Sequence, residues 1–245
     1  MDNDTRRILA DFDKRLERID VSAPLGARRA WRFRAKSIPR ILLTLAVAVV
    51  LPFIVLVRLG SWLYVRWSYP TWVALGLAAG ITVVLLALYA GWISRALTGR
   101  ARLVTVAKWV AVPLVAAYCG YALLYVADTN TKTPEVRSYY RSLHPVLRIA
   151  LSTLILADDA LVITDVARVP EDYERMGLPV RDRSHHYRQR DGYVHAADLR
   201  TIGRPTWRNW LIERYFRVMG FRTLRHVGTA DHLHVGLGVP DAQFD

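Results

Sequence analysis

Between Asp20 and Asp128 the chain has no acidic residue, and most of that stretch is apolar. Three segments within it carry no charge at all: residues 41–57, 67–94 and 109–127. About 20 apolar residues in a helix cross the hydrocarbon core of a bilayer, so the second and third segments are long enough. The first segment is shorter, but the sequence stays apolar beyond Arg58, whose long side chain can reach the membrane surface. We therefore expect three transmembrane helices.

The charge balance is typical of a membrane protein rather than a nucleic-acid-binding protein. The chain has 34 Lys and Arg against 21 Asp and Glu, a formal net charge of +13. Residues 1–126 hold 17 basic and 6 acidic side chains (+11), whereas residues 127–245 hold 17 and 15 (+2). A nucleic-acid-binding protein displays its basic residues on a soluble face, but here they flank apolar segments. Arg outnumbers Lys 30 to 4, which is associated with GC-rich bacterial genomes.

The positions of Lys and Arg also predict the orientation of the helices. Basic residues are dense in residues 28–40, ahead of the first helix, and the loop between the second and third helices holds four more. The loop between the first and second helices has only Arg58 and Arg66. Because basic loops stay in the cytoplasm, we expect a cytoplasmic N-terminus and an extracytoplasmic region after Asp128. In a bacterium this is a protein of the inner (cytoplasmic) membrane.

Three regions follow from this pattern. Residues 1–37 are a basic, amphipathic cytoplasmic segment, residues 38–127 hold the membrane helices, and residues 128–245 form an exported domain of mixed α+β fold. In that domain we expect helices over 136–160, 170–176 and 205–219, and strands over 161–164, 193–199, 221–227 and 233–237, the last two pairing to close an antiparallel sheet. In the last helix, Trp207, Trp210 and Tyr215 form a stripe that we interpret as core packing. The only cysteine, Cys119, falls in the third membrane helix, so the exported domain has no disulfide and no thiol nucleophile.

All seven histidines of the chain lie in the exported domain. His232 and His234 are two residues apart on a predicted strand, so their side chains share a face and can converge on one ligand. Imidazole is a preferred ligand of zinc, and a catalytic zinc takes three protein ligands and keeps one position open. Two histidines from separate segments and one carboxylate would meet this requirement.

Four short pieces of the exported domain occur in the order found in a known superfamily of zinc peptidases. These pieces are Ser184-His-His186, Gly192, Ala196-Ala-Asp198 and His232-Leu-His234. Together they resemble the lysostaphin, D-Ala-D-Ala metallopeptidase and hedgehog superfamily, in particular its D-Ala-D-Ala metallopeptidase branch, with the pattern SxHxxGxAxD followed by (E/D/H)xH or ExxH. Residues 161–177 are similar to that branch's strand, arginine and short helix. One departure is the spacing from His186 to Asp198, which is 12 residues where the pattern has seven, so we expect an insertion at residues 188–191.

The resemblance implies a zinc ion held by His186, Asp198 and His234, with His185 as the alternative first ligand. The predicted strand over 193–199 places His195 on the face opposite Asp198, so we do not expect His195 to bind the same metal.

The resemblance also implies the catalytic groups. His232 would take a proton from the attacking water and pass it to the leaving amine, and Asp231 is the alternative. On a regular strand Asp231 faces away from the metal, which favours His232. Arg168 matches the family arginine that contacts the substrate carbonyl or carboxylate and stabilises the developing oxyanion.

The sequence therefore predicts a membrane-anchored, extracytoplasmic zinc metallopeptidase that cleaves the stem peptides of peptidoglycan as a carboxypeptidase or endopeptidase. The alternative is a zinc-stabilised domain without turnover that binds the cell wall or a membrane partner, since hedgehog-type relatives keep such a site without peptidase activity. A transport function of the three helices is disfavoured because they contain no ionisable residue apart from arginine near an edge.

Overall fold

The computed structural model describes residues 38–175, 177, 179, 184–228 and 231–240. The amphipathic segment predicted within residues 1–37 lies outside the described residues. The chain divides into two units, residues 1–46 and 47–245, and all contacts described below are within the second unit.

Three helical stretches are long and apolar enough to cross a membrane, which agrees with the sequence prediction: Ala46–Trp67, Thr71–Arg95 and Leu103–Leu124. The first belongs to α2 (Ile38–Trp67), which continues without a break past Arg58. The second belongs to α3 (Thr71–Thr98). The third is built from α4 (Leu103–Val106), a π-helical turn η2 (Ala107–Ala111) and α5 (Val112–Leu124), so it begins before the charge-free segment and includes Lys108.

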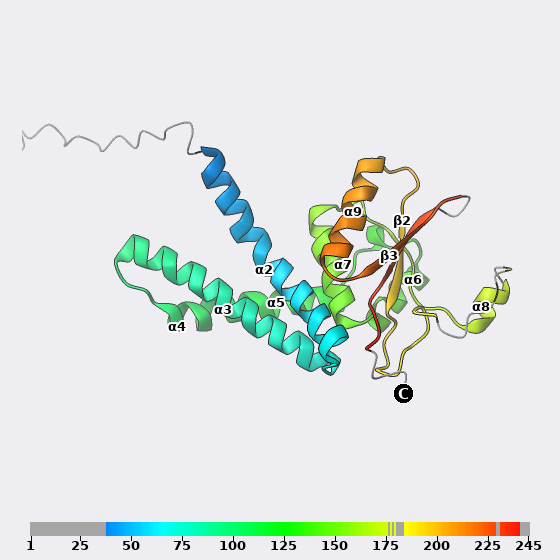
Figure 1. Ribbon diagram of the computed structural model, residues 1–245, viewed down its shortest axis with the longest axis horizontal. Coiled ribbons are helices and arrows are strands. Elements are labelled where there is room, and N and C mark those ends of the chain that lie inside the picture. Colours follow the sequence, from blue (N-terminus) through cyan, green and yellow to red (C-terminus); the bar gives the residue numbers. More distant parts are fainter. Residues whose placement is uncertain (1–37, 176, 178, 180–183, 229–230, 241–245) are drawn as a thin grey trace, which may run out of the picture. The chain divides into compact units, whose positions relative to one another are not determined.

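The rest of the chain forms a small α+β domain with an antiparallel sheet, as predicted (Figure 1). Its strands are β1 (Ile163–Asp165), β2 (Ala196–Arg200), β3 (Arg222–His226) and β4 (His232–Gly236), in the spatial order β1-β2-β4-β3. Its helices are α6 (Pro134–Ser138), α7 (Pro145–Ala157), α8 (Pro170–Arg175) and α9 (Thr206–Val218), with short 3-10 turns at Asp128–Asn130 and Tyr139–Ser142. The prediction of one helix over 136–160 was wrong, because Pro145 has no N–H to continue a preceding helix and instead begins α7 at its first position.

The two faces of the sheet differ in chemistry because side chains alternate along each strand. Leu199 on β2 is paired with Leu233 on β4, and both are buried in the apolar core. Asp198 is paired with His234, and these two side chains point to the opposite face. The polar face of the sheet therefore carries the candidate site, whereas the apolar face packs on the helices.

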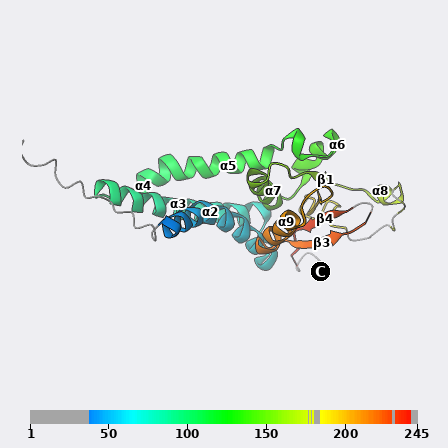
Figure 2. The same ribbon diagram turned by 90° about the horizontal axis from the view of Figure 1, so that it is seen from above.

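The helix α7 joins the membrane-length helices to the sheet in one continuous core (Figure 2). Nine of its 13 residues are buried. At its amino-terminal half, the buried Arg148 donates from Nη1 to the carbonyl of Leu123 at the end of α5, at 2.6 Å. Tyr140, just before α7, donates to the carbonyl of Ala122 at 2.8 Å. The carboxyl-terminal half of α5 is thus held against the domain by polar as well as apolar contacts.

Residues 188–191, expected to be an insertion, form a tight turn that leads into β2. Arg188 bridges to Val194, and Gln189 N–H donates to the carbonyl of Tyr193 at 2.8 Å. Gly192 sits in the turn with φ of +84°, a conformation that residues with a Cβ rarely adopt. This turn directs Asp191 toward the helices α2 and α3.

Candidate metal centre

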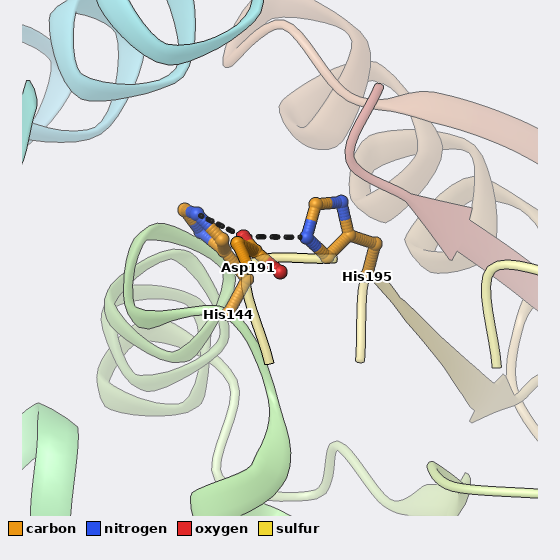
Figure 3. A group of neighbouring side chains, drawn as sticks. All are labelled: His144, Asp191 and His195. Carbon is orange, nitrogen blue, oxygen red and sulfur yellow. Dashed lines mark hydrogen bonds and ion pairs between the residues drawn. The ribbon is translucent and has the colours of Figure 1, made fainter. Parts of the chain in front are cut away.

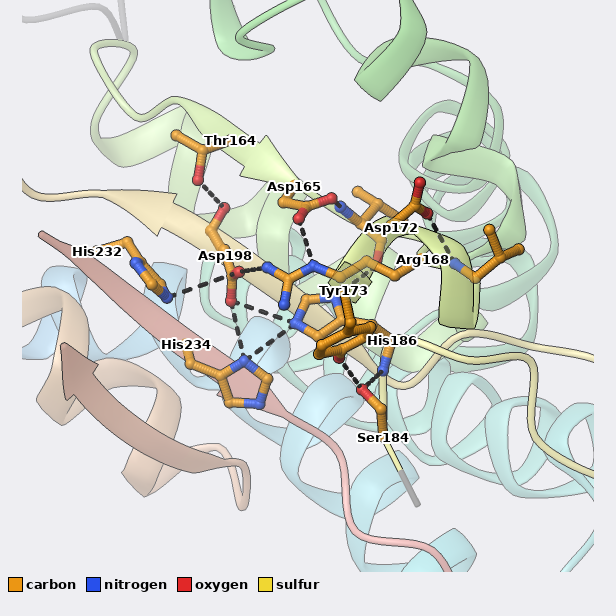
Figure 4. Close-up of polar contacts among 12 residues, drawn as sticks. Thr164, Asp165, Arg168, Asp172, Tyr173, Ser184, His186, Asp198, His232 and His234 are labelled. Carbon is orange, nitrogen blue, oxygen red and sulfur yellow. Dashed lines mark hydrogen bonds and ion pairs between the residues drawn. The ribbon is translucent and has the colours of Figure 1, made fainter. Parts of the chain in front are cut away.

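Three side chains from separate parts of the domain bring their ligand atoms together on the polar face of the sheet (Figure 4). His186 precedes β2, Asp198 lies on β2, and His234 lies opposite it on β4. His186 Nε2 is 3.2 Å from His234 Nδ1 and 3.3 Å from Asp198 Oδ1, and His234 Nδ1 is 2.9 Å from Asp198 Oδ1. Ligands at ordinary zinc bond lengths in a tetrahedral site lie about 3.3 Å apart, so the three atoms have the spacing of one metal's ligands.

The orientation of His186 leaves a lone pair directed at the other two ligand atoms. Its Nδ1 lies 2.6 Å from the carbonyl oxygen of Val166, which can only accept, so Nδ1 carries the proton. Nε2 is then the unprotonated nitrogen of the neutral ring. A metal-binding histidine commonly donates its other N–H to a carbonyl in this way, which fixes the ring. His186 is also 97% buried, with only 3% of its surface exposed, so its ring has little room to turn.

Asp198 is held ionised at the centre of this group. Burial alone would raise the pKa of its carboxyl, but the neighbouring His186 and His234 outweigh burial and lower that pKa well below its usual range. Its second oxygen, Oδ2, accepts a hydrogen bond from Arg168 Nη2 at 2.6 Å. Arg168 Nε in turn donates to Asp165 Oδ2 at 2.6 Å, so the guanidinium is fixed between two carboxylates.

His232 lies beside the group without belonging to it. Its Nε2 is 3.6 Å from Asp198 Oδ2, and its ring stacks on His226 with 4.6 Å between ring centres. It shares the face of β4 with His234, as strand alternation predicts. Asp231 is directed elsewhere, since it accepts hydrogen bonds from Arg225 and from Thr201, the latter at 2.6 Å.

His185 lies near the ring nitrogen of His234 that is not directed at Asp198. A Cβ built on Gly236 would be 3.1 Å from His185 Nδ1 and 3.6 Å from His234 Nε2, so the absence of a side chain at Gly236 leaves room for both rings. Burial, followed by the charge of neighbouring histidines, lowers the pKa of His185 to about 4. The structure brings His186, and not His185, into the group with Asp198 and His234.

A second group of two histidines and one aspartate, which sequence reasoning did not identify, lies near the ends of α2 and α3 (Figure 3). It consists of His144, Asp191 and His195, and by composition and spacing it too could hold a metal ion. His195 was expected to face away from Asp198, and it does, because it joins this second group instead. Two membrane-length helices contribute hydroxyl groups: Tyr64 of α2 and Thr71 of α3.

Hydrogen-bond donors, rather than lone pairs, converge in this second group. Asp191 Oδ2 is 2.8 Å from Tyr64 Oη, 3.0 Å from His195 Nε2 and 3.3 Å from Thr71 Oγ1. His144 Nδ1 accepts from the backbone N–H of Val146 at 3.3 Å, so the proton of the neutral His144 ring is on Nε2, the atom that faces Thr71 and Asp191.

The protonation of these side chains suits a hydrogen-bonded carboxylate. Burial would raise the pKa of Asp191, but the hydrogen bond and charge of His195 lower it well below its usual range. Burial also lowers the pKa of His144, so its ring is neutral. His195 Nδ1 has no hydrogen-bond partner among the described residues, although a metal-binding histidine normally donates its other N–H. We call His144, Asp191, His195, Tyr64 and Thr71 the Asp191 anchor.

Comparisons with protein-family models, curated protein sequences and solved structures find no match to this chain. The resemblance to zinc peptidases therefore stays a prediction from the motif residues. The structure establishes the fold of the domain and two groups of residues that could hold a metal ion.

Proposed function

We propose that the chain is a membrane-anchored, extracytoplasmic zinc metallopeptidase that cleaves peptide stems of the bacterial cell wall. The observation that carries this proposal is the convergence of His186 Nε2, Asp198 Oδ1 and His234 Nδ1 within 3.3 Å of one another on the polar sheet face. The order of these residues in the sequence, which resembles the D-Ala-D-Ala metallopeptidases, adds support.

The donor set fits zinc better than the other common metals. Two imidazole nitrogens and one carboxylate oxygen are typical of catalytic zinc, whereas magnesium and calcium prefer sites of oxygen ligands alone. Three protein ligands would leave a fourth position for water or substrate. When bound there, zinc would lower the pKa of a water ligand and polarise the peptide carbonyl.

The remaining groups have separate tasks in this proposal. His232 accepts a proton from the attacking water and returns it to the leaving amine, because its Nε2 lies beside the group and the ring is partly exposed. Arg168 orients Asp198 by donating the 2.6 Å hydrogen bond to its carboxylate. The other N–H groups of Arg168 would donate to a substrate carbonyl. Asp231 takes no part in proton transfer in this proposal, since its carboxylate accepts hydrogen bonds from Arg225 and Thr201.

The decisive experiment uses the full chain purified in detergent and loaded with zinc. We expect one equivalent of zinc and release of D-amino acids or shortened stems from purified muropeptides, with activity lost after treatment with a chelator and restored by zinc. Zinc binding without turnover of any wall peptide would overturn the peptidase proposal and favour the binding domain described as the alternative.

The proposed orientation is tested separately. The excess of Lys and Arg before Arg40 and between α3 and α4 supports an N-terminus in the cytoplasm. A reporter that is active only outside the cytoplasm should be active when fused after Asp245. Activity of a cytoplasmic reporter at the same position would reverse the orientation and remove access to the cell wall.

A further inference from the structure

Helix α9 exposes an apolar stripe on the side opposite the sheet. Its buried residues include Ile212 and Phe216, which belong to the shared core. On the other side, large apolar side chains are exposed at Trp207 (62%), Trp210 (53%), Leu211 (49%) and Val218 (59%). Their spacing of three, four and seven residues places them on one face of the helix.

This stripe corrects the interpretation of Trp207, Trp210 and Tyr215 as core packing. Only Tyr215 is turned inward, where its hydroxyl donates to the carbonyl of Ala150 at 2.8 Å. The two tryptophans point outward because Ile212 and Phe216 already fill the side of α9 that faces the sheet. Two large aromatic side chains on one exposed face indicate a contact with something outside the described fold.

Arginines accompany both tryptophans. The guanidinium of Arg214 lies 5.4 Å from the centre of the Trp210 ring, and that of Arg208 lies 5.9 Å from the Trp207 ring. Tryptophan, aliphatic residues and arginine along one helix are the composition of helices that lie in the interface of a membrane, where the rings enter the headgroup region and arginine reaches phosphate.

The end of α9 is fixed to the membrane-length helix α2. Ser61 Oγ donates to the carbonyl of Met219 at 2.6 Å. Gly220 follows with φ of +94°, and a Cβ there would come within 2.6 Å of Arg58 Nη1 and 2.7 Å of Ser61 Oγ. Since α2 ends at Trp67, Ser61 lies about 9 Å before the end of the helix, inside the stretch that is apolar enough to cross a membrane.

The direction of the exposed stripe matches this attachment. In Figures 1 and 2, α9 lies between α2 and the strands of the sheet, so the side of α9 opposite the sheet is turned toward the membrane-length helices. Exposed tryptophans also mark the neighbouring ends of these helices: Trp62 and Trp67 on α2, and Trp72 on α3. Tryptophans gather at the level of the headgroups in membrane proteins, so all five fit the interface region of one leaflet.

We propose that α9 lies in the headgroup region of the bilayer leaflet next to the domain, with Trp207, Trp210 and Leu211 in contact with lipid. This inference rests on the proposed membrane location of α2, α3 and α5, but not on peptidase activity. Arg208 and Arg214 would contact lipid phosphate, which favours anionic phospholipids. The candidate metal centre lies on the opposite face of the sheet, so this contact would turn it toward the aqueous side.

The test places single environment-sensitive fluorophores on the full chain in nanodiscs of phosphatidylcholine and phosphatidylglycerol that hold one copy each. Cys119→Ala removes the native thiol, and a cysteine is then introduced as Leu211→Cys on α9. The matched controls are Val84→Cys on α3, 58% exposed and expected in lipid, and Val227→Cys beside the β3–β4 turn, 83% exposed and expected in water. We expect a label at residue 211 to be quenched by a headgroup-depth lipid quencher and several-fold less by iodide than the label at residue 227.

Each other outcome overturns the proposal for a distinct reason. If the label at residue 84 is shielded and the label at residue 211 is as accessible to iodide as that at residue 227, α9 lies in water. If shielding at residue 211 appears only in nanodiscs with two copies, the stripe is an interface between chains. If the label at residue 84 is itself accessible, the membrane location of the helices is wrong, independently of the metal centre.

Discussion

Two groups of two histidines and one aspartate lie in the same domain, and they differ in the direction of their N–H groups. In the group of His186, Asp198 and His234, the Nδ1–H of His186 donates a hydrogen bond to the Val166 carbonyl. The lone pair on His186 Nε2 is therefore directed at the other two ligand atoms. In the Asp191 anchor, His144 accepts from a backbone N–H and turns its own proton toward the carboxylate side. The partner of the second ring nitrogen therefore distinguishes a candidate metal site from a hydrogen-bonded anchor of the same composition.

The largest expected difference between the two groups is in metal binding. Alanine at His186, Asp198 or His234 should each weaken zinc binding by more than about 100-fold, the upper range for loss of an outer-shell partner, and abolish activity. Asp191→Ala and His195→Ala should keep one zinc per chain. Metal analysis of the purified full chain measures this, with circular dichroism to confirm that each variant is helical. Loss of zinc from Asp191→Ala with intact folding would show that the anchor is the metal site.

The next effect concerns proton transfer beside the metal group. His232→Ala should keep zinc but lower the rate of peptide cleavage by about 10²–10⁴, the usual contribution of a positioned acid–base group. Asp231→Ala should be milder, because Arg225 and Thr201 hold its carboxylate away from the ligands. Steady-state kinetics on one wall peptide gives the ranking, and the reverse ranking would assign the proton transfer to Asp231.

The anchor should be more important for stability than for metal binding. Asp191→Ala removes the acceptor shared by Tyr64, Thr71 and His195, and buried donors without a partner cost about 1–3 kcal/mol each. We expect the free energy of unfolding to fall by roughly 3 kcal/mol, seen as a lower midpoint of thermal unfolding in detergent. The exposed Asp159→Ala is the matched control and should change stability by less than about 0.5 kcal/mol. Equal midpoints of thermal unfolding for the two variants would contradict a structural role of the Asp191 anchor.

The smallest effect is on the pH dependence of stability. Burial, and secondarily the charge of His195, lowers the pKa of His144 well below its usual value of about 6.5. Below about pH 6.5, His144 binds a proton in the unfolded chain but stays neutral in the folded chain. The free energy of unfolding therefore falls as the pH falls. Between pH 6.5 and 5 this amounts to at most about 2 kcal/mol. His144→Asn keeps a side chain that can cap α7 but cannot titrate here, so its unfolding midpoint should depend less steeply on pH. An unchanged slope would contradict a neutral, buried His144.

The parts of the fold that were predictable are those encoded locally. Long charge-free runs predicted the three helices, and alternation predicted that His232 and His234 share a face and that His195 points away from Asp198. The anchor could not be predicted, because its five residues come from α2, α3, the residue before α7, a turn and the residue before β2. The one available signal was the long spacing between His186 and Asp198, whose extra residues form the turn that carries Asp191. The outward direction of Trp207 and Trp210 was missed because helical spacing does not tell which side of a helix faces the core.

The helices and the sheet share a single core, and its parts are synthesised in chain order. The stretch from Val47 to Leu124 is synthesised before α7, so the surfaces that α7 covers are made first. Among the described strands β4 is made last, yet it lies between β2 and β3 and carries His234. A nascent chain that lacks β4 has only two members of the metal group. Metal capture is thereby delayed until nearly the whole chain has been made, so a prematurely ended chain cannot form the complete three-ligand group.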